Sequence, residues 1–308
     1  MQENNSWEQK TINDMLAMTI KEQRARRRWG IFFKSIIIIY VLFLTFASMR
    51  GRDLASSVKH KPYTAVVNIT GEIAAEKDSS AENIIPLLRK AFENSGAKAV
   101  MLRINSPGGA PVQTNEMLAE IRHLRAKHPE KKLYAVIEDV GASAAYMLAC
   151  AADEIYADEA SLVGSIGVLA ESFGLVGAIN KLGIERRLYT SGSNKAMLDP
   201  FSPVKPEQIA MLQTELDKIH QMFINLVKQS RGDRLHVTKD MFSGRVWIGA
   251  EAKEIGLIDG FGHPYSVARD VIGAPELAEY EVKQSLFSHL RGSMSGAMRD
   301  LFLTQRIL

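Results

Sequence analysis

Short apolar runs alternate with amphipathic helical patterns through the middle of the chain. Runs rich in apolar and β-branched residues predict strands at Tyr63–Thr70, Ala97–Ile104, Leu133–Ile137, Glu154–Tyr156 and Arg187–Thr190. Between them, apolar residues three or four positions apart predict helices, one through Ile84, Ile85, Leu87, Leu88, Ala91 and Phe92 and another through Met117, Leu118, Ile121 and Leu124. Strands that alternate with helices predict an α/β fold with a mostly parallel sheet and right-handed crossovers.

The last third of the chain is mostly helical by the same criterion. A long helix is expected to begin within Ser202-Pro-Val-Lys-Pro206, with an apolar stripe at Leu212, Leu216, Ile219, Phe223 and Leu226. A short helix is expected between the glycine-rich turns of 244–262. The C-terminal tail, 276–308, is amphipathic in places, which suits docking on its own domain, on a neighbouring subunit or on a membrane surface.

One long apolar segment, 29–49, differs from these patterns. It is about as long as the core of a bilayer, and its single charge, Lys34, lies near its start, where a long stem can reach the headgroups. A cleaved signal peptide is the alternative, but a long polar stretch precedes the run, and Ala47-Ser-Met49 is a poor cleavage site. The segment is therefore predicted to be an uncleaved transmembrane anchor.

The anchor divides the chain into five predicted parts: a cytoplasmic segment at 1–28, the anchor at 29–49, a linker at 50–62, a folded domain at 63–275 and the tail at 276–308. Basic residues cluster more tightly before the anchor than after it, which favours a cytoplasmic N-terminus. The folded domain is then expected on the outer side of the cytoplasmic (inner) membrane, in a periplasm or other extracytoplasmic space.

Composition narrows the possible functions. The chain of 308 residues is 46% hydrophobic and 24% charged, which is typical of a globular protein. A net charge of +3 with scattered basic residues argues against nucleic-acid binding. Cys150 is the single cysteine, so neither an intrachain disulfide nor a cysteine-rich metal cluster can form. The histidines lack ligand spacing, and no nucleotide-binding motif occurs, so we expect no metal and no cofactor.

Ser143 lies where a predicted strand meets the predicted helix Ser143–Ala151. A serine at a helix N-terminus commonly caps the helix, with its hydroxyl accepting from an amide. A nucleophilic serine instead needs open space, which the small residues on both sides of Ser143 provide. The backbone amide of Ala144, next in the chain, suits a donor to an oxyanion.

Gly108 and Gly109 end an earlier predicted strand, in Asn105-Ser-Pro-Gly-Gly109. Without a Cβ, this backbone allows a substrate carbonyl to approach closely, and amides at such a turn point toward anions. A plain strand-to-helix turn is the alternative, since Pro-Gly-Gly forms such turns often.

A nucleophilic serine needs a base. The histidines fall mostly in charged helical stretches, and the chain has no Gly-x-Ser-x-Gly motif. Lys195 follows a predicted strand and a Ser191-Gly-Ser193 turn, and burial can make a lysine neutral enough to act as a base. An exposed loop lysine is the alternative interpretation. Ser191 or Ser193 is spaced so that its hydroxyl could orient the lysine amine.

Five motifs occur together in an order that resembles bacterial signal peptide peptidase A, in its short form with one N-terminal anchor. The motifs, which span roughly residues 63–275, are Asn105-Ser-Pro-Gly-Gly109, Gly141-Ala-Ser-Ala-Ala-Tyr146, Ser191-Gly-Ser-Asn-Lys195, Gly244-Arg-Val-Trp-Ile-Gly249 and Gly256-Leu-Ile-Asp-Gly260. Each motif is weak alone, and the combination is specific.

This resemblance implies a fold like that of the Clp protease and the crotonases, with Ser143 as nucleophile and Lys195 as general base. It implies oxyanion donors from the Gly108–Gly109 turn. It also implies substrates that are released signal peptides or other short or unfolded polypeptides, and assembly into a ring or dome in which different subunits sometimes supply the serine and the lysine. Two departures are visible: Ala144 and Ala145 follow the serine where glycines are usual, and Ala196 follows the lysine where an acidic residue is frequent.

Two other functions remain compatible with these residues. A crotonase-type acyl-CoA enzyme also uses backbone oxyanion donors, although an anchor and a serine–lysine pair argue against it. A catalytically silent membrane scaffold of the same fold is the second alternative, which the alanines after Ser143 leave open.

Overall fold

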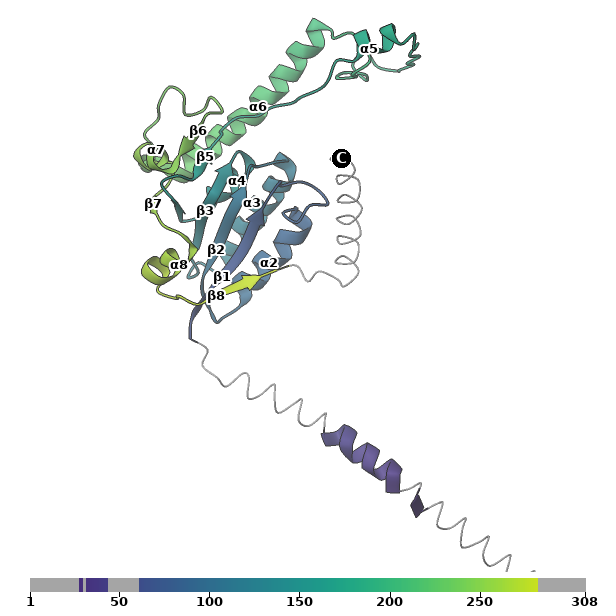
Figure 1. The fold of residues 1–308 in the computed structure, drawn as a ribbon. Helices are drawn as coiled ribbons and strands as arrows, with labels where there is room; N and C mark the ends of the chain where they lie inside the picture. The colour runs from purple at the N-terminus through teal and green to yellow at the C-terminus, as the bar shows by residue number, and fades with distance from the viewer. Residues whose placement is uncertain (1–27, 30–31, 44–60, 282–308) are drawn as a thin grey trace, which may run out of the picture. The chain divides into compact units, whose positions relative to one another are not determined.

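The computed structural model describes residues 28–29, 32–43 and 61–281, which belong to two compact units, Met1–His60 and Lys61–Leu308 (Figure 1). In the first unit, residues 28–29 and 32–43 are helical, and their apolar side chains are exposed. Of the predicted anchor, residues 30–31 and 44–49 lie outside the described residues, as do 1–27, 50–60 and 282–308 of the flanking segments. No helix in the described ranges combines the length and the apolar character that crossing a membrane requires.

The second unit is an α/β structure, as the alternating pattern predicted. Its elements in chain order are β1 (Tyr63–Thr70), α2 (Ala81–Glu93), β2 (Ala97–Ser106), α3 (Pro111–Lys127), β3 (Leu133–Ala142), α4 (Ala144–Ala149), β4 (Glu154–Ala157), β5 (Leu162–Gly164), α5 (Val176–Lys181), α6 (Pro206–Arg231), the 3₁₀ helix η1 (Gly232–Arg234), β6 (Val246–Ile248), α7 (Gly249–Glu254), β7 (Gly260–Phe261), α8 (Pro264–Ser266), the π-helical η2 (Val267–Ile272) and β8 (Leu277–Tyr280). Proline opens both α3 and α6, where its missing N–H leaves no hydrogen bond unmade.

The strands form one sheet in the order β6-β5-β3-β2-β1-β8, with β4 pairing with β3 and β7 pairing with β4. All pairings are parallel except that of β5 with β6, so the predicted mostly parallel sheet is confirmed. The first half of β3 pairs with β4 and its second half with β5, so the sheet forks along this strand. Strand β8 lies beyond residue 275, within the segment predicted as a tail.

Alternating side chains place the two faces of the sheet in different surroundings. One face carries residues such as Val67, Leu102 and Ala135, which join the main core with α2, α3 and α4. The other face carries residues such as Met101 and Val136, which pack against η2 in a smaller cluster. The helical stripes predicted for α2 and α3 are buried in the main core or packed against it, so the spacing argument holds for both helices.

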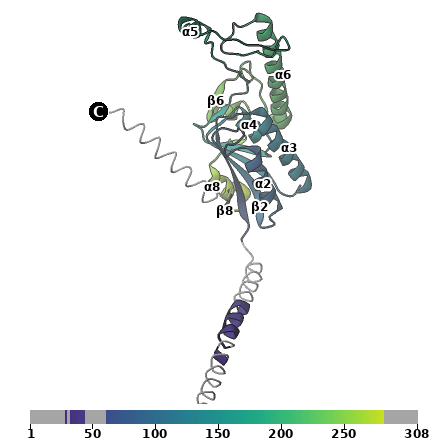
Figure 2. The same cartoon turned by 90° about the vertical axis from the view of Figure 1, so that its right-hand side faces the viewer.

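Residues 167–222, called the arm below, project away from the sheet and contain α5 and the first part of α6 (Figures 1 and 2). Only Gln208 is buried among them, and the arm exposes large apolar side chains such as Phe173, Leu182 and Tyr189. The long helix predicted after Pro206 is present as α6, but of its predicted stripe only Phe223, which lies beyond the arm, is buried.

The strand predicted at Arg187–Thr190 is wrong, because these residues lie in the arm without regular secondary structure and are exposed. The apolar side chains of Leu188 and Tyr189, on which the prediction depended, are 43% and 88% exposed. These residues pair with no strand of the sheet that the structure describes. A short apolar run becomes a strand only where a neighbouring strand can accept its hydrogen bonds.

Candidate active site

Ser143 occupies a sharp connection between β3 and α4. Its backbone angles are φ 53° and ψ −126°, and a positive φ is uncommon and strained for a residue with a Cβ. The amide of Ser143 donates to the Gly164 carbonyl at 2.8 Å, and its carbonyl accepts from the Met147 amide at 3.0 Å. These backbone hydrogen bonds hold a conformation that the residue alone would not favour.

The Ser143 hydroxyl is not used as a helix cap, so this alternative is contradicted. The side chain is half-buried and has no hydrogen-bond partner within the described part of the chain. Ala144 and Ala145, which stand where the resemblance leads one to expect glycines, are helical, buried and outside the positive-φ region. Alanine therefore fits both positions without strain.

The Gly108–Gly109 turn lies directly against Ser143. A Cβ on Gly108 would be 2.7 Å from Ser143 Cβ and 2.9 Å from the Ala144 amide nitrogen, and Gly108 has a φ of 108°. A Cβ on Gly109 would be 2.2 Å from the Ile73 carbonyl oxygen. Both glycines are required, since any side chain there would collide with backbone.

Two of the three predicted oxyanion amides remain available. The Gly108 amide already donates to Ser106 Oγ at 3.2 Å. The amides of Gly109 and Ala144 have no acceptor among the residues that the structure describes. The turn itself is held by Ile73, whose amide donates to the Gly108 carbonyl at 2.9 Å and whose carbonyl accepts from the Ala110 amide at 2.7 Å. Ser143 thus lies near two backbone amides, those of Gly109 and Ala144, that are available to donate to an oxyanion.

Helix α4 is anchored by a buried polar network at its far side. Tyr146, fully buried, donates its hydroxyl to the Leu257 carbonyl at 2.7 Å. Arg231, at the end of α6, donates to the Gly256 carbonyl at 2.8 Å and to both oxygens of Asp259 at 2.8 and 2.9 Å. Burial alone would raise the pKa of Asp259, but the hydrogen bonds and charges of its partners, Arg231 first, outweigh burial and lower it.

Lys195 lies in the arm, in a turn between α5 and α6 (Figure 1). Its side chain is exposed and makes no hydrogen bond or ion pair with any described residue. Ser191 and Ser193 are exposed in the same turn, and neither hydroxyl bonds to the lysine; the Ser193 carbonyl accepts from Gln208 at 3.2 Å instead. The predicted strand before this turn is absent, and within one chain no hydrogen bond or ion pair joins Lys195 to Ser143 among the described residues.

The sequence interpretation missed the turn at 164–167, which supplies the acceptor for the Ser143 amide. Gly164 and Ser165 both have positive φ, 98° and 50°. The signal was present in the sequence Val163-Gly-Ser-Ile-Gly167, where two glycines flank a short segment directly after a β-branched residue. His220, one of the histidines in a helical stretch, is half-buried, and its Nε2 lies 3.0 Å from the Ile166 carbonyl oxygen in this turn.

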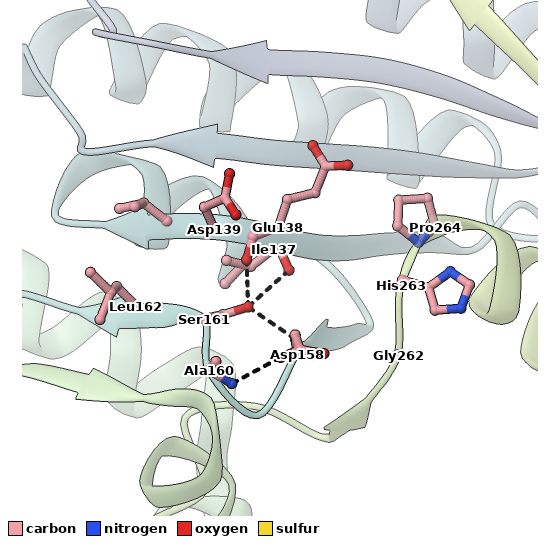
Figure 3. Close-up of a pocket in the computed structure, with 11 residues that line it drawn as sticks. Ile137, Glu138, Asp139, Asp158, Ala160, Ser161, Leu162, Gly262, His263 and Pro264 are labelled. Carbon is pink, nitrogen blue, oxygen red and sulfur yellow. Dashed lines mark hydrogen bonds between the residues drawn. The ribbon is translucent and has the colours of Figure 1, made fainter.

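A separate hollow of about 510 Å³ lies in the fork between β4 and β5 (Figure 3). Glu138, Asp139 and Asp158 line it, and Ser161 donates its hydroxyl to the Glu138 carbonyl across its floor. Glu138 lies 3.6 Å from Arg103, and Asp139 accepts from Asn105 at 2.8 Å, so these carboxylates have partners. None of the predicted site residues lines this hollow. In the described ranges no group of histidine, cysteine and carboxylate side chains is arranged to hold a metal ion.

Comparison with known proteins finds a peptidase family and protease relatives. Residues 125–271 match the model of peptidase family S49. Over 207 residues the chain is 32% identical to "Protease 4" of Haemophilus influenzae, covering 64% of this chain and 32% of that protein. Over 183 residues it is 33% identical to "Serine protease SPPA, chloroplastic" of Arabidopsis thaliana, covering 59% of this chain and 27% of that protein.

A third relative has a different kind of name. The chain is 46% identical over 205 residues to "Na(+)/H(+) antiporter NhaA" of Brucella melitensis, which covers 67% of this chain and 28% of that protein. The chain therefore spans about a third or less of each of these three relatives, and the antiporter name describes a protein that lies mostly outside the match. The predicted resemblance to signal peptide peptidase A is nevertheless confirmed by the family model, which matches residues 125–271 as a peptidase family S49 domain, and by the protease relatives.

Proposed function

We propose that the chain is a serine endopeptidase in which Ser143 is the nucleophile and Lys195 the general base. The observation that carries the proposal is the geometry at the β3–α4 junction. Ser143 is strained, its hydroxyl is unpartnered, and it lies beside the unpartnered amides of Gly109 and Ala144. Strain of this kind costs about 1–3 kcal/mol, persists only where the surrounding structure holds it, and is frequent at active sites. An acyl-transfer site needs this combination of nucleophile and oxyanion donors.

The proposed reaction runs through an acyl-enzyme. Neutral Lys195 takes the proton of the Ser143 hydroxyl as its oxygen attacks a peptide carbonyl, and the amides of Gly109 and Ala144 hold the oxyanion. Lys195 then gives the proton to the leaving amine, which departs and leaves the ester on Ser143. Water, deprotonated by the same lysine, hydrolyses the ester, and the proton returns to the serine oxygen.

The lysine is proposed to come from a neighbouring copy of the chain. The exposure of Lys195 and its place in the arm support this arrangement, because within one chain the arm leads the lysine away from the sheet. The exposed apolar side chains of the arm also support it, since they would be covered by contact with another copy. In a ring or dome, every Ser143 would receive a lysine from a neighbour, with Ser191 or Ser193 orienting the amine.

The proposed substrates are released signal peptides and other short or unfolded polypeptides. This part rests on the resemblance to signal peptide peptidase A, which the S49 match and the protease relatives named above support. The proposed location is the inner membrane, with segment 29–49 as the anchor and the peptidase unit on the extracytoplasmic side. The apolar sequence of that segment and the preceding basic cluster support this topology.

Single substitutions of the two side chains test the chemistry. Ser143→Ala and Lys195→Ala are each expected to lower peptide hydrolysis by purified full-length protein by at least about 10⁴-fold. A serine-reactive fluorophosphonate is expected to label the wild type and not Ser143→Ala. Activity close to wild type in either variant would remove that residue from the mechanism. Absence of labelling and of hydrolysis in the wild type would favour the silent scaffold, and binding of an acyl-CoA would favour the crotonase-type enzyme.

A further inference from the structure

The base of the arm consists of two chain segments, which are joined at one carbonyl group. The outgoing chain leaves the sheet through the turn 164–167, and the returning chain is α6, which carries His220. The Ile166 carbonyl accepts from the Gly244 amide at 3.1 Å and lies 3.0 Å from His220 Nε2. A carbonyl oxygen can only accept, so Nε2 must carry the hydrogen and donate it.

His220 lies where α6 changes its surroundings. Toward the end of the helix, Phe223 and Val227 are buried in the main core, at 2% and 0% exposure. Before His220, most residues of the helix are exposed and belong to the arm. Its hydrogen bond is therefore the side-chain contact that joins the returning helix to the outgoing turn at the base of the arm.

The same turn fixes the nucleophile. Gly164 accepts from the Ser143 amide at 2.8 Å, and Ser165 donates its amide to the Arg245 carbonyl at 2.9 Å. Ser165 has a φ of 50°, which is strained for a residue with a Cβ and persists only if its surroundings hold it, whereas Gly164 adopts its φ of 98° freely. Ile166, the next residue, is itself fully buried, and its carbonyl has two partners, the Gly244 amide and His220.

We propose that His220 is a positioning residue for the serine–lysine reaction. Its hydrogen bond to the Ile166 carbonyl holds the turn that fixes Ser143 and sets the direction in which the arm presents Lys195. His220 neither touches the substrate nor transfers a proton. The inference rests on the proposed function, because it assigns His220 to the alignment of that same site.

Two variants with side chains of similar length test whether the hydrogen bond donated by His220 matters. In His220→Gln the carboxamide can still donate to the Ile166 carbonyl, whereas in His220→Met a side chain of similar size cannot. The readouts are kcat per active serine, titrated with the fluorophosphonate, and KM, both measured well below each variant's melting temperature. His123→Gln and His123→Met, at an exposed histidine of α3, are the matched controls.

We expect His220→Met to lower kcat on the order of 10- to 100-fold with KM little changed, because misplacement of reacting groups by about 1 Å has effects of this size. His220→Gln should recover most of that loss, and the His123 pair should match the wild type. A wild-type kcat per titrated serine in His220→Met, even with a lower melting temperature, would overturn the proposal. Equal loss of kcat in His220→Gln and His220→Met would overturn it as well, since the donated hydrogen would then be irrelevant. If His220→Met fails to fold, His220→Leu, which also lacks a donor, takes its place in the same comparison with His220→Gln.

Lys195→Ala in the same assay separates the two proposals. If it retains activity, the serine–lysine mechanism fails whatever the His220 variants do. If it is inactive while His220→Met turns over like the wild type, only the positioning role of His220 fails.

Discussion

Ser143 and Lys195 have different surroundings: apolar core packing stabilises the region around Ser143, whereas the region around Lys195 is exposed and held by polar contacts. Ser143 stands on a buried six-residue helix, α4, inside the main core, and its strained backbone is held by the turns around it. Lys195 stands in an arm with one buried side chain, Gln208. The arm is held by polar contacts: Arg186 pairs with Asp199 at 2.6 Å, and the Leu175 amide donates to the Pro200 carbonyl at 2.6 Å.

This difference indicates how the proposed site is divided. A strained nucleophile needs a rigid support, and the parallel sheet with its buried helices supplies one. The base needs to reach a nucleophile that its own chain does not place beside it, and a projecting arm can do so. In the proposed assembly, a neighbouring copy would stabilise the arm by covering its exposed apolar side chains.

The largest expected effect comes from mixing two inactive proteins. Ser143→Ala and Lys195→Ala, dissociated and reassembled together at equal amounts, should recover about a quarter of wild-type activity if each site takes its serine and lysine from different copies at random. Peptide hydrolysis before and after mixing measures this. Each variant carried through the same procedure alone is the control. A mixture as inactive as its components would mean that both residues act within one chain.

The next largest effect is on the free energy of unfolding. An arginine-to-methionine substitution in the core is compared with one in the arm. Arg231→Met removes a buried guanidinium and leaves Asp259 with weaker compensation, so the free energy of unfolding should fall by about 3 kcal/mol. Arg187→Met in the arm breaks an exposed pair with Glu185 and should change it by less than about 0.5 kcal/mol. Urea unfolding of both variants checks this. Equal losses would mean that the arm is as tightly packed as the core.

The same network predicts a pH dependence. Because the folded-state pKa of Asp259 is lowered, its carboxylate stabilises the fold above its unfolded pKa of about 3.9, and this contribution disappears as the pH falls through the folded-state pKa. Asp259→Asn should therefore be less stable than the wild type at neutral pH, and the difference should shrink on acidification. Thermal melts between pH 7 and about pH 2 measure it. A difference that is independent of pH would remove the carboxylate from this role.

A smaller effect is expected from the exposed apolar side chains of the arm. Tyr189 and Phe173 are 88% and 79% exposed, so changing both to serine should leave the unfolding of the core unchanged. If another copy covers this surface, the double variant should dissociate at higher protein concentration than the wild type and lose activity with it. Sedimentation over a dilution series reports the assembly. Lys218→Ser, at an exposed charged position of α6, is a control for substitution alone.

The smallest effect concerns Cys150, the only thiol. It is buried behind α4, and burial raises its pKa to about 12, so very little thiolate exists in the folded protein at pH 8. Iodoacetamide should alkylate it in denaturant and leave it unmodified in the native protein, as mass spectrometry would show. Rapid native alkylation would mean that the core beside Ser143 opens more readily than its packing indicates.

Local patterns in the sequence predicted most of the fold. Strands β1 to β4 and helices α2 and α3 follow from local apolar patterns, because the residues that form a buried strand or helix face are close together in the sequence. The strand predicted at Arg187–Thr190 had the same local signal and failed, because pairing requires a second strand that the local sequence does not contain. For the candidate site, Gly108 lies against Ser143, and their catalytic roles stay predictions. The approach of Lys195 to Ser143 was not seen within one chain.

The sequence by itself determined that a serine would stand between a buried strand and a helix, near a turn that only glycine can form. It could do so because residue size, apolar spacing and backbone freedom act over a few neighbouring positions. Only the tertiary structure decided that His220 meets the Ile166 carbonyl, that Arg231 meets Asp259, and that Lys195 is carried outward on an arm. These contacts join segments far apart in the chain, and their partners are selected by the packing of the whole unit, which no local pattern encodes.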